Sequence, residues 1–187
     1  MEKYFDKYRI SSNRHQNYDY SSPGAYYVTI CTRKREHHFG EIKNGFMELS
    51  VIGSVAHYFW KEIPLHFPFV SLEEFVIMPN HVHGIIIINE SICLKPNKIV
   101  MAVETQDLAS LHVDCHNHKI NHFGPQSRNL ASIIRGFKSA VKKYATMNNI
   151  DFSWQSRYYD HIIRQESDFN RIKIYISAKN PHHIFFT

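Results

Sequence analysis

The stretch MPNHVHGIIII at residues 78–88 predicts a buried strand that begins directly after a tight turn. Side chains alternate between the two faces of a strand, so His81 and His83 are expected to face the same way. The apolar run that follows them is typical of a rigid strand covered on both faces. Two imidazoles fixed side by side on such a strand form half of a metal site. The alternative, two histidines on a half-exposed strand without a ligand, stays open for so short a pair.

The first half of the chain shows strand, hairpin and helix patterns in that order. Residues 26–32 are rich in β-branched and aromatic side chains and predict a strand. The dipeptide Asn44-Gly45 between two short apolar segments predicts a hairpin turn. Ser50 is expected to cap a helix that runs to about Glu62, because apolar residues recur there at helical spacing.

Further elements are predicted on either side of a long segment without periodicity. Residues 73–78 predict a second strand, and 81–88 are either its continuation or its hairpin partner. A helix is predicted from residue 129, followed by an aromatic, basic linker at 152–159. A last helix is expected from about 167 to about 179. This order of elements indicates an α+β fold in which helices pack on one face of an antiparallel sheet.

The same patterns suggest how the chain is divided. We expect an N-terminal arm at residues 1–23, one domain at 24–181, and a C-terminal tail at 182–187. A long insertion at about 89–127 interrupts the domain, and a loop of that length is either functional or disordered. It contains a possible second metal cluster, for which a polar insertion is the alternative because the spacing matches no zinc finger. The members of this cluster are His112, Cys115, His116, His118 and His122.

Composition restricts the setting of the protein more than its activity. The net charge is +5 with neutral histidines, which permits a nucleic acid or an acidic surface as partner. Three cysteines in no disulfide-like spacing favour a reducing compartment. No apolar run approaches the roughly 20 residues that cross a bilayer, and no secretory signal is visible. A cytoplasmic protein without a membrane segment is therefore expected.

Five ordered blocks of sequence together resemble a known family. The blocks are GAYYVTICT at 24–32, FGEI at 39–42, FVIMPNHVH at 75–83, RGFKSAV at 135–141 and WQSRYYDHIIR at 154–164. They resemble the REP-associated tyrosine transposases, within the single-tyrosine HUH transposase-like superfamily, over most of residues 18–181. The resemblance implies a ferredoxin-like sheet and an enzyme that cleaves and joins single-stranded or hairpin DNA. It also implies a homodimer.

The resemblance also implies roles for particular residues. His81 and His83 would hold a divalent metal, Mg²⁺ or Mn²⁺, and Tyr175 would attack the scissile phosphodiester to form a 5′-phosphotyrosine. A phenol has a pKa near 10 and is a poor nucleophile at neutral pH unless it is activated, and a metal on the phosphate oxygens would stabilise the charge that develops there. Relatives place an amide four residues after the tyrosine, where it can supply a third ligand. Here that position is Lys179, and Asn180 follows it, which makes Asn180 a doubtful third ligand.

Basic and aromatic residues on the last two helices and the linker are candidate DNA contacts, because phosphates attract cations and bases stack on aromatic rings. A solvated helix face and ordinary packing are the alternatives. The candidates are Arg135, Lys138, Lys142, Arg157, Tyr158, His161, Arg171 and Lys179.

Two other functions stay open at the level of sequence. One is a DNA-binding relative that has lost cleavage, which the cation at Lys179 suggests. The other is a metal-dependent hydrolase with a water nucleophile. The absence of a carboxylate close to the histidine pair in the sequence argues against it.

Overall fold

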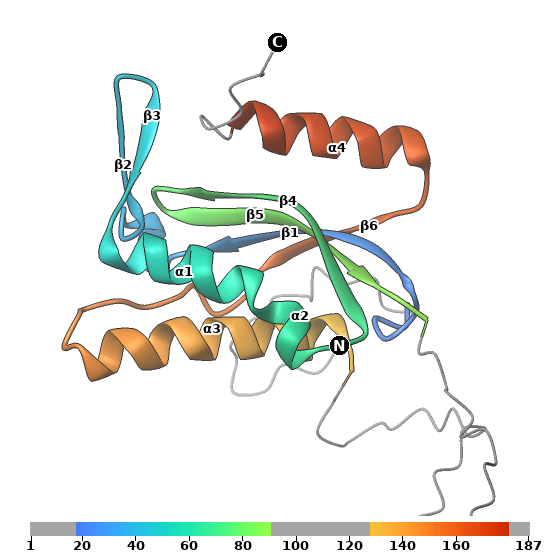
Figure 1. The fold of residues 1–187 in the computed structure, drawn as a ribbon, viewed down its shortest axis with the longest axis horizontal. Coiled ribbons are helices and arrows are strands. Elements are labelled where there is room, and N and C mark those ends of the chain that lie inside the picture. The colour runs from blue at the N-terminus through green and yellow to red at the C-terminus, as the bar shows by residue number, and fades with distance from the viewer. Residues whose placement is uncertain (1–17, 91–127, 180–187) are drawn as a thin grey trace, which may run out of the picture.

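A four-stranded antiparallel sheet in the order β4-β5-β1-β6 lies at the centre of the fold (Figure 1). The computed structural model describes residues 18–90 and 128–179. The central strand β1 pairs with β5 on one side and with β6 on the other. The strands are β1 (Gly24–Cys31), β4 (Val70–Met78), β5 (His81–Ile88) and β6 (Tyr159–Ile163).

Helices cover both faces of this sheet, as Figure 1 shows. On one face lie α1 (Val51–Lys61), the short α2 (Ile63–His66) and α3 (Leu130–Met147). On the other face lies α4 (Glu166–Lys179), the last described helix. A small hairpin of β2 (Gly40–Lys43) and β3 (Phe46–Leu49) and a 3-10 turn, η2 (Arg33–Arg35), stand between β1 and α1 in the chain.

The predicted α+β class is confirmed, and the topology is ferredoxin-like. The elements β1, α1, β4, β5, α3 and β6 follow the order β-α-β-β-α-β, with all neighbouring strands antiparallel. In one detail the structure differs from the prediction that the helices share one face, because α4 packs on the opposite face. The physical reason is that both faces of the sheet are apolar and each needs a cover.

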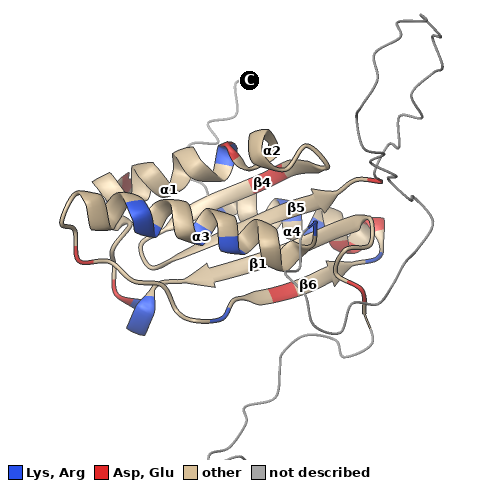
Figure 2. Cartoon of the chain, turned by 90° about the horizontal axis from the view of Figure 1, so that it is seen from below, with Lys and Arg blue, Asp and Glu red and all other residues tan. Residues whose placement is uncertain are grey.

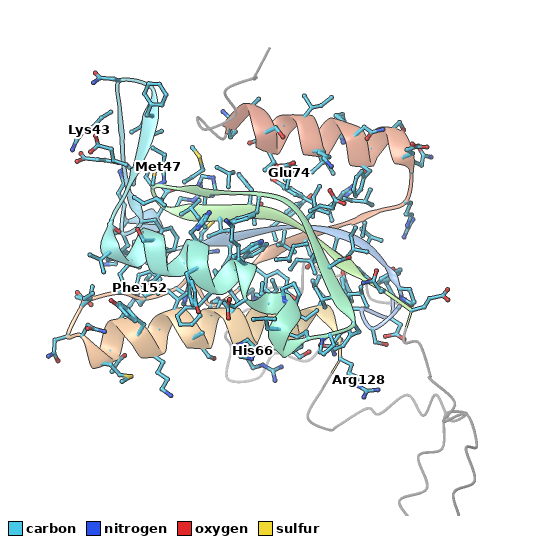
Figure 3. The ribbon with its side chains drawn as sticks, viewed as in Figure 1. Lys43, Met47, His66, Glu74, Arg128 and Phe152 are labelled. Atoms are coloured by element: carbon cyan, nitrogen blue, oxygen red, sulfur yellow. The ribbon has the colours of Figure 1, made fainter. Side chains whose placement is uncertain are left out.

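The two helix layers bury two separate apolar clusters, which alternate along β5. Val82, Ile86 and Ile88 join the large cluster under α1 and α3. Ile85 belongs to a smaller cluster with Ile172 and Ile176 of α4. The odd-numbered positions of β5 therefore face α4, and His81 and His83 share that face. Side chains fill the layers on both sides of the sheet (Figure 3).

The predicted element boundaries agree with the structure at three places. Residues 81–88 are the hairpin partner of the preceding strand, with Met78 opposite His81. Ser50 caps α1, since its side-chain oxygen accepts a hydrogen bond from the backbone N–H of Gly53 at 3.0 Å. Asn129 begins α3 with a reciprocal capping box.

Strand β6 is not among the predicted elements, because the sequence patterns predict no element between the linker at 152–159 and the helix that starts near residue 167. Its segment is short and half-exposed, and it carries Asp160 and His161 among its five residues. Pairing with β1 along its whole length is what makes it a strand.

Several sequence predictions fall on residues outside the described ranges. These are most of the N-terminal arm, the insertion from residue 91 onward with its His/Cys cluster, the doubtful ligand Asn180 and the C-terminal tail. Among the helices within residues 18–90 and 128–179, none is long and apolar enough to cross a membrane.

Candidate active site

The two motif histidines lie side by side at the start of β5, on the face that α4 covers. Their ring centroids are 4.4 Å apart, with the ring planes at 73°. The register of the sheet places Thr29 of β1 opposite His83, and Cys31 opposite His81. His83 is only 8% exposed, so its ring belongs to the wall between sheet and helix rather than to the surface.

Two hydroxyl groups on β1 contact the same ring nitrogen of His83, Nδ1. The Oη of Tyr27 lies 2.7 Å from His83 Nδ1, and the Oγ1 of Thr29 lies 2.9 Å from the same nitrogen. The Tyr27 ring also stacks on the imidazole at 5.5 Å with an interplanar angle of 22°. Each hydroxyl can either donate to Nδ1 or accept its hydrogen, and in the Nδ1–H tautomer the lone pair that can bind a metal is on Nε2.

The amide of Asn80 fixes the ring of His81 in an equivalent way. Asn80 Nδ2 donates a hydrogen bond to the carbonyl of Arg35 at 3.1 Å, which assigns the other end of the amide as the oxygen. That oxygen lies 2.6 Å from His81 Nδ1 and therefore accepts the Nδ1–H. The lone pair of His81 is then on Nε2, the nitrogen left free to bind a metal.

Burial keeps both imidazoles neutral at physiological pH. It lowers the pKa of His83 to about 4, with smaller contributions from His81 and Lys179. It also lowers the pKa of His81, and the nearby charges of Arg35 and Lys179 act in the same direction. A metal ion binds only the neutral form of imidazole, so the pair needs no deprotonation before it binds one.

Tyr175 of α4 lies over the histidine pair. Its ring centroid is 5.7 Å from that of His83, with the planes at 70°. The side chain is 46% exposed, while Ile172 and Ile176 on the neighbouring face of the helix are buried. The Nζ of Lys179, one turn later, lies 5.8 Å from the centroid of the Tyr175 ring. The structure thus brings the predicted nucleophile to the predicted ligands across a long separation in sequence.

Ion pairs join α4 to both outer strands of the sheet. Asp168 accepts from His161 of β6 at 2.6 Å and is also paired with Arg171. Lys173 pairs with Glu73 of β4 at 2.8 Å. His161 and Arg171, which were predicted DNA contacts, are therefore engaged with Asp168, and both lower the pKa of that carboxyl. In this structure His161 attaches α4 to β6, whereas Arg171 pairs with the same carboxylate within the helix.

The histidine pair fits a divalent metal as two donors of a larger set. Two neutral imidazoles with free Nε2 lone pairs are common metal ligands. Within the described residues, no group of three or more His, Cys, Asp or Glu side chains is placed to complete a site. The predicted third ligand, Asn180, lies outside the described residues.

The predicted DNA contacts on α3 lie on the other side of the sheet from this site. Seen from below in Figure 2, α3 with its Lys and Arg positions is nearest to the viewer. Lys138 Nζ donates to the carbonyl of Gln155 at 2.5 Å, and Lys142 Nζ donates to that of Phe152 at 2.6 Å. Both lysines thus fasten the segment that leads to β6. The prediction that they are DNA contacts is not tested by this arrangement.

Arg135 and Tyr158 line a groove of about 560 Å³ on the same side of the sheet, together with both of these lysines. Arg157 is exposed in the segment just before β6. The eight predicted DNA contacts therefore do not form one surface, because three of them accompany α4 and four line the groove beside α3.

Four residues of the site were not identified from the sequence, namely Tyr27, Thr29, Asn80 and Arg35. One signal was available. Tyr27 and Thr29 are polar residues at alternate positions of an otherwise apolar strand, which indicates one shared polar face. Their position opposite His83 depends on strand register, which the sequence did not give.

Comparison with known proteins gives one relative in sequence. An uncharacterized protein of Haemophilus influenzae is 39% identical over 171 residues, which cover 91% of this chain and 87% of that protein. No family model matches the chain.

Comparison with solved structures gives a likeness in fold. A REP-associated tyrosine transposase bound to a REP hairpin matches with a TM-score of 0.53 at 15% identity, covering 87% of this chain and 70% of that one. A transposase-like protein of Deinococcus radiodurans matches with a TM-score of 0.42 at 11% identity, covering 89% of this chain and 97% of that one. At these identities the likeness concerns the fold.

Proposed function

The chain belongs to the same family as the uncharacterized Haemophilus influenzae protein. From its transposase-like fold and the site beneath α4, we propose that this protein is a DNA-processing enzyme. Its proposed activity is metal-dependent cleavage and joining of single-stranded or hairpin DNA, as in a REP-associated tyrosine transposase. Tyr175 is the proposed nucleophile, and His81 and His83 are the proposed metal ligands.

One observation carries this proposal. Tyr175 is partly exposed on the last described helix, and its ring centroid lies 5.7 Å from that of the buried His83. The ring centroid of His81 lies 4.4 Å from that of His83. The strand and the helix are joined by more than 70 residues of chain, so sequence proximity does not explain the contact. A nucleophile beside a metal-binding pair is the arrangement that phosphoryl transfer requires.

The reaction that follows from this geometry is an in-line displacement at phosphorus. The Oη of Tyr175 forms a bond to phosphorus, the bond from phosphorus to the 3′ oxygen breaks, and the phenolic proton is lost to solvent. The 3′ oxygen takes up a proton and leaves as a hydroxyl. The 5′ phosphate stays on the tyrosine, so a later attack by a 3′-hydroxyl can rejoin the strand without ATP.

The residues around the tyrosine have distinct tasks in this proposal. Tyr27, Thr29 and Asn80 orient the two imidazoles so that each keeps Nε2 free. A divalent ion held there would offset the negative charge that develops on the phosphate oxygens. Lys179, whose Nζ lies 5.8 Å from the centre of the Tyr175 ring, places a positive charge where the phosphate would approach.

A second candidate function is supported by the same lysine. A protonated lysine cannot ligate a metal, and the described residues contain no group of three or more His, Cys, Asp or Glu side chains that could hold one. A DNA-binding relative without cleavage activity would have this appearance. It would bind hairpin DNA and form no covalent product with any divalent metal.

The test is the covalent adduct itself. A hairpin oligonucleotide labelled at its 3′ end is incubated with protein and MnCl2 and then run on a denaturing gel. We expect a labelled protein band, because the fragment 3′ to the break stays on the enzyme. Tyr175→Phe should abolish the band. Tyr58→Phe, which removes a hydroxyl from another exposed tyrosine, on α1, should leave it unchanged.

Each result of this experiment separates the candidates. A band of unchanged intensity in Tyr175→Phe overturns the assignment of the nucleophile. Binding of the hairpin by wild-type protein without a band in Mn²⁺ or Mg²⁺ favours the cleavage-deficient relative. The proposal includes a homodimer, which sedimentation of the full chain tests by its mass in solution.

A further inference from the structure

A row of contacts crosses the face beneath α4, from η2 through the β4–β5 turn and β5 to α4. Asn80 links the carbonyl of Arg35 to the ring of His81 through hydrogen bonds of 3.1 Å and 2.6 Å. His81 contacts His83, and His83 contacts Tyr175. Lys179 lies beside Tyr175 at the far end. A cationic residue thus stands at each end of a row whose middle is neutral.

The first of these, Arg35, belongs to a turn that is held in an unusual backbone conformation. Lys34 and Arg35 have φ values of 53° and 57°, in the left-handed region that residues other than glycine seldom adopt. Hydrogen bonds retain the turn there: Thr32 N–H donates to the carbonyl of Asn80 at 2.9 Å, and Arg35 N–H donates to that of Thr32 at 3.2 Å. The turn is therefore fastened to the loop that begins β5.

The second cation, Lys179, comes from the last described turn of α4. Its Nζ lies 5.8 Å from the centre of the Tyr175 ring, and its charge reaches both His81 and His83. Arg35 acts on His81 from the other end of the row. The two charges therefore meet at His81, and that of Lys179 also reaches His83.

Neither cation is neutralised by the part of the chain that the structure describes. Within these residues no carboxylate pairs with Arg35 or with Lys179. By contrast, Arg171 and Lys173 on the same helix are both paired with acids. Two exposed and unpaired cations at the ends of a neutral row form a surface that attracts an anion.

We propose that Arg35 and Lys179 form a two-point clamp for the backbone of a single DNA strand. This inference rests on the proposed function and names the residues that hold its substrate. The strand would lie across the histidine pair from η2 to the end of α4, with one phosphate against each cation. The clamp binds DNA by charge alone and requires no metal.

Because each contact of a cation with a phosphate releases a bound counterion, the clamp can be tested through the salt dependence of binding. Binding of a fluorescent 20-nucleotide oligothymidylate to the full chain is followed by anisotropy in EDTA over a range of KCl. For a single strand, each lost phosphate contact lowers the slope of log K against log salt by about 0.7. Arg35→Gln and Lys179→Gln should each show this loss, and the double variant about 1.4.

A matched control removes the same charge elsewhere. Lys61→Gln takes an exposed cation from α1 on the opposite face, and its slope should equal that of the wild type. Lys179→Arg should retain the slope, because a guanidinium also contacts phosphate. Circular dichroism of each variant establishes that it is folded, so a structural defect is recognised independently of the slope.

The outcomes separate the clamp from the proposed function. Unchanged slopes in both single variants overturn the clamp, even if the Tyr175 adduct forms. Reduced slopes in both support it, even if no adduct forms and the chain proves to be a binding protein. An equal loss in Lys61→Gln, or no binding of the oligonucleotide by wild-type protein, also overturns the clamp.

Discussion

The histidine that matters most at the residue scale is His83, whose ring is fixed on three sides. Tyr27 stacks on it and, with Thr29, contacts Nδ1, while Tyr175 approaches from α4. Burial with these partners defines both the orientation of the ring and its neutral state. A consequence for stability follows, because the unfolded chain takes up a proton on this ring at a higher pH than the folded chain does.

We expect the metal-free protein to lose stability as the pH falls. The pKa of His83 is about 4 in the folded chain and near 6.5 when unfolded, so below pH 6.5 the unfolded chain binds the extra proton. Stability from this group is complete above pH 6.5 and declines by about 3 kcal/mol by pH 4. Urea unfolding in EDTA at pH 7, 6 and 5 measures this.

Substitution of the histidine isolates its share of that decline. His83→Gln should flatten the dependence between pH 6.5 and 4, while His66→Gln, which changes an exposed histidine, should not. Identical pH dependence in wild type and His83→Gln would show that the burial of this imidazole has no linked cost.

Gly84 next to the pair has a packing role that can be tested in the same assay. A Cβ at this position would lie 2.3 Å from Cζ2 of the buried Trp60. We expect Gly84→Ala to lower the free energy of unfolding by about 1–3 kcal/mol through overpacking. Gly136→Ala is the control, because the nearest atom there is at 3.2 Å and belongs to the end of the Phe67 ring. A stable Gly84→Ala protein would mean that Trp60 moves without cost.

At the scale of elements, α4 is attached less firmly than the other long helices. It buries two residues, Ile172 and Ile176, whereas α3 buries six. Its remaining attachments are the pairs of Lys173 with Glu73 and of Asp168 with His161. Such partly exposed pairs contribute little stability, so the two isoleucines are what hold Tyr175 over the histidine pair.

We therefore expect Ile176→Ala to release α4 without unfolding the sheet. Loss of a buried isoleucine costs about 2–5 kcal/mol, which is large for a helix held by so few contacts. Amide hydrogen exchange should speed up throughout α4 and stay slow in β1 and β5. Ile174→Ala, on the same helix but 69% exposed, should change neither. Faster exchange in the sheet of Ile176→Ala would contradict independent attachment.

Sequence patterns were sufficient for elements whose signal is local. The shared facing of alternate side chains on β5, the cap at Ser50 and the Asn44-Gly45 turn each depend on a few adjacent residues. Each agrees with the structure. Properties that depend on distant pairing were not available in this way. Strand β6 exists because it pairs with β1, and the contacts of Tyr27 and Thr29 with His83 depend on register.

The predicted DNA contacts also divide into features that the local sequence indicates and contacts that depend on distant parts of the chain. A basic stripe on α3 can be recognised from its spacing, yet the carbonyls of Gln155 and Phe152 that accept from Lys138 and Lys142 belong to another segment. Arg35 was visible only as the end of a short basic run, because its link to His81 passes through the amide of Asn80.

At the scale of the whole molecule, the two faces of the sheet differ in kind. The face under α1 and α3 holds the large core, including Tyr26, Trp60 and Phe152. The face under α4 holds a small cluster around Ile85 beside the polar row of the site. Folding stability is thereby concentrated on one side, which leaves the other side available for polar residues that a core would exclude.

The chain order of these parts has a consequence during synthesis. The ribosome makes β1 and β5 first, and the helix with Tyr175 comes after every described strand. A nascent chain thus carries its paired imidazoles long before it carries the tyrosine. A protein interrupted anywhere before residue 166 would lack all of α4, and with it the proposed nucleophile. The proposed cleavage activity therefore requires translation through the last described helix.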